Sequence, residues 1–150
     1  MSKRALVTGG GGFIGGHIAR DLIHRNYEVV IIDNLKTGNK QNIPNKAIFI
    51  NSDVGQDTYE NIFSSPFDLI YHFAGQSSVE ISYSDPIYDI ETNVKSTLIL
   101  LKHVEKYCPK AHFIYARSMS VYGGEEPMPK TEDMLLNGNN FYAIGQKASE

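Results

Sequence analysis

The 150-residue sequence contains a single cysteine, Cys108, and therefore cannot form an internal disulfide. A lone thiol suits a reducing compartment, and we expect a cytoplasmic protein. No apolar run approaches the roughly 20 residues that a membrane-spanning helix needs, so we expect no membrane partner. The net charge of −3 offers no basic footprint for nucleic acid. The five histidines lack metal-ligand spacing, and we expect no metal site.

A glycine-rich stretch stands between a short apolar run and a helical pattern. The run at 5–7 is typical of a buried strand, and the apolar residues that follow the glycines recur at helical spacing. Such a turn needs residues without a Cβ, because the backbone bends sharply and lets a ligand approach. The N-terminus of the following helix favours a phosphate. Gly10, Gly12 and Gly15 meet the G-x-G-x-x-G spacing and predict a phosphate-binding turn.

Asp33 stands at the end of the next apolar run, 29–32. A carboxylate at that place can accept hydrogen bonds from an adenosine ribose, and it would repel the 2′-phosphate of NADP. The alternative is that Asp33 merely ends a strand in a turn. Together with the glycine turn, it predicts a dinucleotide-binding βαβ unit that prefers NAD.

The rest of the chain continues the alternation of strands and helices, with the composition of one globular domain. We expect a doubly wound parallel sheet, an α/β fold of the Rossmann type whose ligand edge lies at the carboxyl ends of the strands. The predicted strands are 4–8, 28–33, 47–50, 68–72 and 112–116, and the predicted helices are 13–25, 58–63, 87–107 and one beginning at 141.

The longest predicted helix carries an apolar stripe. We expect this stripe to pack against the sheet and Asn93 to lie beside it on the helix surface. The stripe consists of Ile90, Val94, Leu98, Leu101 and Val104.

Short motifs follow in order along the chain. They are Thr8-Gly9-Gly10-Gly11-Gly12-Phe13-Ile14-Gly15, Asp33-Asn34-Leu35, Asp53-Val54, His72-Phe73-Ala74-Gly75, Asn93-Val94, Ser118-Met119-Ser120-Val121-Tyr122-Gly123 and Tyr142. The ordered set resembles the extended short-chain dehydrogenase/reductase family, in particular its NAD-dependent nucleotide-sugar epimerases and dehydratases. The likeness covers essentially the whole chain.

The resemblance implies NAD as the cofactor. Asp53 corresponds to a residue that contacts the adenine, although an acid at this place can also cap a short helix. The cofactor residues that the resemblance implies are Gly9, Gly12, Phe13, Ile14, Gly15, Asp33, Asn34, Leu35, Asp53, Val54, Phe73, Ala74, Gly75, Asn93 and Tyr142.

The resemblance also implies a set of catalytic and substrate-binding residues. Tyr142 acts as a phenolate base that takes the proton of a sugar hydroxyl while the carbon delivers hydride to the nicotinamide. Ser118 hydrogen-bonds the same oxygen. Gln76 and Ser77, together with Ser118 and Tyr142, are the implied substrate contacts.

The chain departs from the family pattern one helical turn after Tyr142. The family has a lysine there, whose charge makes the tyrosine a base, and this sequence has Gln146. Lys147 is rotated by about 100° and should face elsewhere. Gln146 keeps a hydrogen-bonding group for the ribose but no charge, so we expect a weakened or altered catalyst. Arg117 replaces a common serine and would face either the substrate diphosphate or a surface salt bridge.

Met119 and Ser120 follow Ser118, where related dehydratases carry an acid. The resemblance therefore favours 4-epimerisation of a UDP-sugar through a transient 4-keto intermediate. The alternatives are a nucleotide-sugar dehydratase or 2-epimerase, and a non-catalytic NAD-binding module. We expect residues 1–150 to form the NAD-binding domain with the start of the catalytic helix, truncated before the substrate-binding portion. By analogy with relatives, a homodimer is expected.

Overall fold

The computed structural model describes residues 3–56, 59–124 and 128–150. The chain forms two compact units. The first comprises Met1–Ala74 with Ile99–Ala116, and the second comprises Gly75–Leu98 with Arg117–Glu150. None of the helices in the described ranges combines the length and the hydropathy that a membrane span requires.

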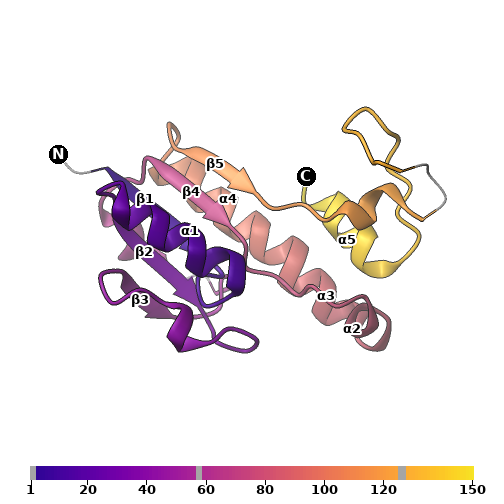
Figure 1. The fold of residues 1–150 in the computed structure, drawn as a ribbon, viewed down its shortest axis with the longest axis horizontal. Helices are drawn as coiled ribbons and strands as arrows, with labels where there is room; N and C mark the ends of the chain where they lie inside the picture. The colour runs from indigo at the N-terminus through magenta and orange to yellow at the C-terminus, as the bar shows by residue number, and fades with distance from the viewer. Residues whose placement is uncertain (1–2, 57–58, 125–127) are drawn as a thin grey trace. The chain divides into compact units, whose positions relative to one another are not determined.

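The first unit contains a parallel sheet of five strands, ordered β3-β2-β1-β4-β5 (Figure 1). Every neighbouring pair is parallel, which confirms the predicted doubly wound sheet. Connections between parallel strands must cross over the sheet, so the ends that follow the strands all meet at one edge. The strands are β1 (Arg4–Thr8), β2 (Glu28–Asp33), β3 (Ile48–Asn51), β4 (Leu69–His72) and β5 (His112–Tyr115).

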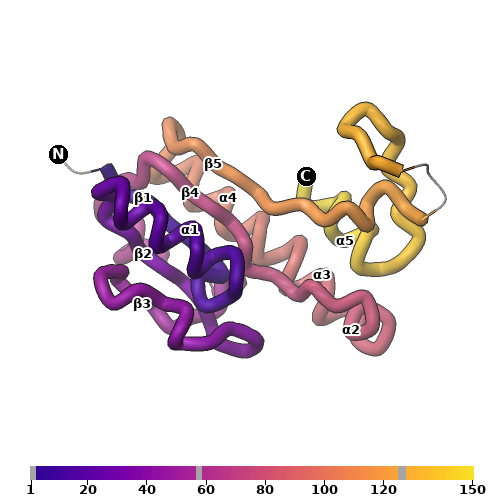
Figure 2. The backbone as a smooth tube through the Cα atoms, viewed as in Figure 1, coloured from indigo at the N-terminus to yellow at the C-terminus, as the bar shows by residue number. Residues whose placement is uncertain are grey.

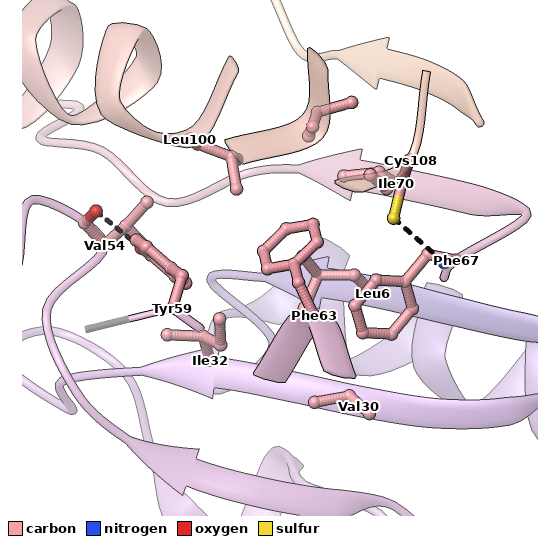
Figure 3. Close-up of a cluster of buried hydrophobic side chains, with 11 residues drawn as sticks. Leu6, Val30, Ile32, Val54, Tyr59, Phe63, Phe67, Ile70, Leu100 and Cys108 are labelled. Carbon is pink, nitrogen blue, oxygen red and sulfur yellow. Dashed lines mark hydrogen bonds between the residues drawn. The ribbon is translucent and has the colours of Figure 1, made fainter. Parts of the chain in front are cut away.

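Alternate residues of each strand point to opposite faces of the sheet, and residues of both kinds are apolar. Each face is therefore covered by a cluster of packed side chains, as is usual in parallel sheets. On one face, Ala5 and Val7 pack in a cluster with Ala19 and Leu22 of α1 (Phe13–His24). The other face belongs to a second cluster, in which Figure 3 shows the rings of Tyr59, Phe63 and Phe67 side by side. This second cluster consists of Leu6, Val30, Ile32, Val54, Tyr59, Phe63, Phe67, Ile70, Leu100, Val104 and Cys108.

Helix α1 begins directly after the glycines, with Gly12 as its N-cap. The tube in Figure 2 follows the backbone from β1 through this turn, back along α1 and into β2, which runs parallel to β1. The helix ends at His24, and Asn26 adopts a left-handed φ of 62°. Asparagine tolerates this conformation better than most residues, so Asn26 can follow the end of the helix.

The segment between β3 and β4 differs from its prediction. A short helix was expected over 58–63, and the structure has a 3₁₀ helix at Ile62–Ser64, while residues 57 and 58 lie outside the described residues. A second 3₁₀ turn, Lys40–Asn42, lies in the polar loop after β2, where Asn39 Oδ1 accepts a hydrogen bond from Gln41 N at 2.9 Å.

The second unit is built from short helical segments. These are α2 (Val79–Ser84), α3 (Pro86–Ile90), a π-helical turn (Glu91–Lys95), the first residues of α4 (Ser96–Tyr107), a 3₁₀ turn (Met119–Tyr122) and α5 (Phe141–Ala148). Side-chain caps begin three of the helices. Ser78 Oγ accepts from Ile81 N at 3.3 Å, Asp85 Oδ1 from Tyr88 N at 3.0 Å and Asn140 Oδ1 from Ala143 N at 2.8 Å.

The predicted apolar stripe of the long helix is largely wrong. Val104 is buried, but Ile90 and Leu98 are 50% and 59% exposed, and Asn93, expected on the surface, is only 2% exposed. The helix instead buries polar side chains that bond to its own backbone. Thr97 Oγ1 donates to Asn93 O at 2.6 Å, and Ser96 Oγ donates to Thr92 O at 2.5 Å.

Two leucines of α4 offer a matched test of this burial. Leu100 is fully buried and Leu98 is 59% exposed. We expect Leu100→Ala to lower the free energy of unfolding by about 2–5 kcal/mol, because it removes buried methyl groups and leaves a cavity. At a protein concentration low enough to keep the chain monomeric, Leu98→Ala should change it by less than about 0.5 kcal/mol. Urea unfolding measures both, and equal losses in the two variants would contradict the assigned faces.

Candidate functional site

The glycine turn after β1 tolerates no side chain at two positions. Gly9 has a φ of +70°, and a Cβ there would stand 2.7 Å from backbone atoms of Phe73 and Ala74. A Cβ on Gly15 would lie 2.3 Å from the carbonyl oxygen of Gly9. The turn is closed by a hydrogen bond from Gly12 N to Gly9 O at 3.0 Å. The backbones of β1 and α1 therefore contact each other directly at the turn. No side chain of the turn covers the N-terminus of α1, so its N–H groups can bind an anion.

Asp33 joins the end of β2 to this turn. Its Oδ2 accepts a hydrogen bond from Gly11 N at 2.8 Å, and its Oδ1 accepts one from Leu35 N at 2.7 Å. The residue is 8% exposed. A carboxylate offers about four acceptor positions, so two remain for a ligand hydroxyl. The carboxylate stands beside the glycine turn, as a ribose-binding role requires, and its contact with NAD stays a prediction.

Asn34 and Asp53 lie together at the ends of β2 and β3. Asn34 Nδ2 donates to Asp53 Oδ2 at 2.8 Å, and Gly55 N donates to Asp53 Oδ1 at 2.7 Å. Asp53 thus accepts one hydrogen bond from the Asn34 side chain and a second one from the backbone of its own turn, at Gly55. Val54 is buried in the apolar cluster of the first unit. The adenine contacts of this pair remain predictions.

Thr8 and His72 form a buried pair that the sequence analysis did not single out. They are register partners on β1 and β4, with Thr8 Oγ1 2.6 Å from His72 Nδ1. Ala74 N also donates to Thr8 Oγ1, at 3.2 Å. The pair therefore positions the Phe73–Ala74 backbone, which was predicted to follow the cofactor. Burial lowers the pKa of His72 to about 4.

The first residues of α1 present apolar side chains to solvent. Phe13 is 77% exposed and Ile14 is 58% exposed. The Phe13 ring lies 4.6 Å from the ring of His17. Because these side chains point outward, a bound phosphate would meet the backbone N–H groups of Phe13 and Ile14 rather than their side chains.

Gln76 and Asn93 face each other in the second unit. Asn93 Oδ1 accepts from Gln76 N at 2.8 Å, and Asn93 Nδ2 donates to Gln76 O at 3.0 Å. A Cβ on Gly75 would stand 2.6 Å from Asn93 Oδ1, which explains the glycine there. The Gln76 amide itself donates to Ser78 O at 2.8 Å and to Asp89 Oδ1 at 2.6 Å. Ser77 remains exposed, and both substrate roles stay predictions.

Ser118 caps the 3₁₀ turn that follows β5. Its Oγ accepts from Ser120 N at 3.2 Å and from Ser120 Oγ at 2.9 Å. Arg117 forms a salt bridge with Glu150 at 2.7 Å and stacks over the Tyr122 ring, whose hydroxyl it also contacts. Arg117 thus makes the predicted salt bridge, and a contact with the substrate diphosphate stays a prediction.

Helix α5 buries two of the predicted catalytic residues. Tyr142 is 9% exposed and Gln146 is 6% exposed. Lys147 points away, as predicted, and its Nζ lies 3.4 Å from Leu136 O at the surface. Position 146 therefore shares the buried face with Tyr142, one helical turn away. The catalytic roles of Ser118, Tyr142 and Gln146 stay predictions.

The candidate metal-ligating side chains of residues 3–56, 59–124 and 128–150 do not cluster. No group of three or more histidine, cysteine, aspartate or glutamate side chains there is arranged to hold a metal ion. The polar contacts described above are made mainly by backbone N–H groups, hydroxyls, amides and the carboxylates of Asp33 and Asp53.

Comparisons with known proteins agree with this geometry. The family described as "NAD dependent epimerase/dehydratase family" matches residues 5–150. A putative UDP-glucose 4-epimerase of Methanocaldococcus jannaschii is 38% identical over 146 residues, which cover 97% of this chain and 48% of that protein. The chain thus spans about half the length of the relatives it matches.

Solved structures of UDP-glucose 4-epimerases are similar to nearly the whole chain. The Thermus thermophilus UDP-glucose 4-epimerase in complex with NAD has a TM-score of 0.89 and 34% identity, covering 97% of this chain and 48% of that one. The Thermotoga maritima enzyme with UDP-glucose has a TM-score of 0.90 and 32% identity over the same shares of the two chains.

The buried histidine predicts a pH-dependent stability. Its folded-state pKa of about 4 lies below the ordinary histidine value of 6.5, so the unfolded chain binds more protons between these pH values. The free energy of unfolding should therefore fall by about 3 kcal/mol as the pH drops from 6.5 to 4. His72→Asn keeps an acceptor near the Nδ1 position and should remove this loss.

Urea unfolding of wild type and variant at several pH values measures the difference. His112→Asn, at an exposed histidine, is the matched control and should follow the wild type. A wild-type loss that His72→Asn leaves intact would contradict the assignment.

Proposed function

Because the chain belongs to the NAD-dependent epimerase/dehydratase family, we propose that it binds NAD and carries out 4-epimerisation of a UDP-sugar through a transient 4-keto intermediate. The observation that carries the proposal is the glycine turn, where Gly15 meets the Gly9 carbonyl and Asp33 accepts the Gly11 N–H. The relatives named as UDP-glucose 4-epimerases support the reaction.

The residues of the first unit suit the pyrophosphate and adenosine of NAD. Backbone N–H groups at the start of α1 can bind the pyrophosphate, since only glycines lie between them and β1. The Asp33 carboxylate can accept the ribose hydroxyls, and its charge opposes a 2′-phosphate. When bound, the nicotinamide accepts a hydride and returns it.

Residues of the second unit would handle the sugar. In the proposed reaction Tyr142 removes the hydroxyl proton of the sugar and later returns it to the same oxygen. Ser118 holds that oxygen by a hydrogen bond. Between the two hydride transfers the 4-keto sugar rotates and presents its opposite face to the nicotinamide. The reaction expels no leaving group, so it needs no side chain to protonate one. Met119 and Ser120 carry no carboxyl for an elimination, which favours this reaction over a dehydratase.

A second candidate function is NAD binding without turnover. Gln146 favours it, because a neutral amide occupies the buried position where the resemblance expects a lysine. Incubation of the purified protein with NAD and UDP-galactose distinguishes the epimerase from the NAD-binding module. Formation of UDP-glucose supports the epimerase, whereas saturable NAD binding without sugar conversion supports the binding module. Absence of NAD binding would contradict both.

Gln146→Lys should raise the rate of sugar conversion at neutral pH. An unperturbed tyrosine has a pKa near 10, and a positive charge one helical turn away favours its phenolate. We expect an increase of about a hundredfold, at the low end of the usual range of general-base effects. Conversion of UDP-galactose measures it.

The matched control is Lys147→Gln, which removes an exposed charge beside the same position and should leave turnover unchanged. An unchanged or lower rate in Gln146→Lys, with folding and NAD affinity intact, would refute this role of position 146.

We also propose that the protein forms a homodimer in the cytoplasm. The lone, buried Cys108 suits a reducing compartment. Ile87, Ile90 and Leu98 are 67%, 50% and 59% exposed at helical spacing, which leaves an apolar face for a second copy.

Sedimentation velocity should show twice the monomer mass. Leu98→Glu should give a monomer, because it places a charge in the buried contact. Leu135→Glu, at a leucine that is 82% exposed outside this spacing, should remain dimeric. A monomeric wild type would contradict the proposed dimer.

A further inference from the structure

A fully buried carboxyl group lies among the candidate residues of the second unit. Asp89 in α3 is 0% exposed. Its Oδ1 accepts hydrogen bonds from Gln76 Nε2 at 2.6 Å and from Asn93 Nδ2 at 3.1 Å. Its Oδ2 is buried and has no hydrogen-bond partner among the described residues. One oxygen therefore holds two amides while the other holds none.

The unpartnered oxygen faces the helix that carries Tyr142. A Cβ placed on Gly145 of α5 would stand 3.0 Å from Asp89 Oδ2. That separation is tighter than ordinary van der Waals contact, so a larger side chain at 145 would displace the helix or the carboxyl. Gly145 lies between Tyr142 and Gln146 in sequence. The close approach of α5 thus depends on the Asp89–Gly145 pair.

The surroundings of Asp89 do not favour a charge. Both of its donors are neutral amides, and the basic side chains of this unit with a described contact lie elsewhere: Lys95 pairs with Glu91, Arg117 with Glu150, and Lys147 reaches Leu136 O. Burial raises the pKa of the Asp89 carboxyl, and the hydrogen bonds from Gln76 and Asn93 lower it. A buried oxygen without a hydrogen-bond donor destabilises the folded state, and more so when the group is charged.

We propose that Asp89 is a positioning residue of the active site. Through Oδ1 it orients the side chains of Gln76 and Asn93, and through Oδ2 it sets the approach of α5 at Gly145. The side-chain N–H groups of Gln76 donate to Ser78 O and Asp89 Oδ1. Gln76 therefore affects the substrate indirectly, by fixing the loop around residues 76–78. The inference rests on the proposed function for the reaction that these groups serve.

Two substitutions at Asp89 separate its shape from its charge. Asp89→Asn keeps one oxygen as acceptor for both amides and fills the same volume. Asp89→Ala removes the acceptor and leaves Gln76 Nε2 and Asn93 Nδ2 short of a partner. In the full reaction with NAD and UDP-galactose, we expect Asp89→Ala to lower kcat by about tenfold to a hundredfold with a smaller change in KM. Asp89→Asn should stay within about threefold of the wild type.

Ser96→Ala is the matched control for local destabilisation. Ser96 is also buried and its hydroxyl bonds to Thr92 O, so the variant loses a buried hydrogen bond without touching Gln76, Asn93 or Gly145. It should lower the melting temperature but keep kcat. An Asp89→Ala kcat no lower than that of Ser96→Ala would overturn the proposal.

Substitutions at Gly145 test the second contact. Gly145→Ser brings a hydroxyl donor to the unpartnered Oδ2, whereas Gly145→Ala brings only the methyl group. The serine variant should be more stable than the alanine variant when Asp89 is present. In the Asp89→Ala background the difference should vanish. An equal difference in both backgrounds would show that Asp89 and Gly145 are not coupled.

A readout independent of turnover keeps this test separate from that of the proposed function. In NMR spectra of the wild type and of Asp89→Asn, the side-chain amide protons of Gln76 and Asn93 should have chemical shifts away from those of free amides and should exchange slowly with water. In Asp89→Ala they should lose both properties. A wild type that shows these signals without converting sugar would refute the proposed epimerase only. Signals unchanged in Asp89→Ala would refute the positioning role, whatever the activity.

Discussion

The contact between the Gly15 backbone and the carbonyl of Gly9 is the constraint on which the rest of the structure depends. A Cβ at Gly15 would stand 2.3 Å from that oxygen, so β1 can feed α1 through so short a turn only with glycine there. Because the turn is this tight, the Gly11 N–H reaches the Asp33 carboxylate at 2.8 Å. The same bend places the start of α1 at the carboxyl edge of the sheet, where parallel sheets bind their ligands.

Most of the sheet was predictable because its strands are short apolar runs that end in polar or glycine-rich segments. The strands β1 and β2 match their predicted ranges, since both faces are buried and the apolar signal is continuous. Helix α2 was not predicted. Its six residues carry too little periodicity, and its only clear start signal is the Ser78 cap. Short helices of this kind are fixed by their caps and by tertiary packing.

The long helical segment shows where sequence periodicity misleads. Its apolar residues suggested the buried face, yet Asn93 is buried and Leu98 is exposed. The polar face is buried because its groups find partners: Asn93 pairs with the Gln76 backbone, and Thr97 bonds to Asn93 O. Similarly, the Thr8–His72 pair depends on strand register, and the Asp89–Gly145 contact joins residues far apart in sequence. No local pattern announces such pairs, whereas the glycine turn and Asp33 have fixed spacing.

The central claim is that backbone N–H groups at the first turn hold the pyrophosphate of NAD. The most direct measurement is an NMR titration of the ¹⁵N-labelled chain with NAD. If the pyrophosphate binds there, the amide signals of Gly12, Phe13 and Ile14 should shift most and saturate together. Saturable binding with those three signals unmoved, or no binding at all, would contradict it.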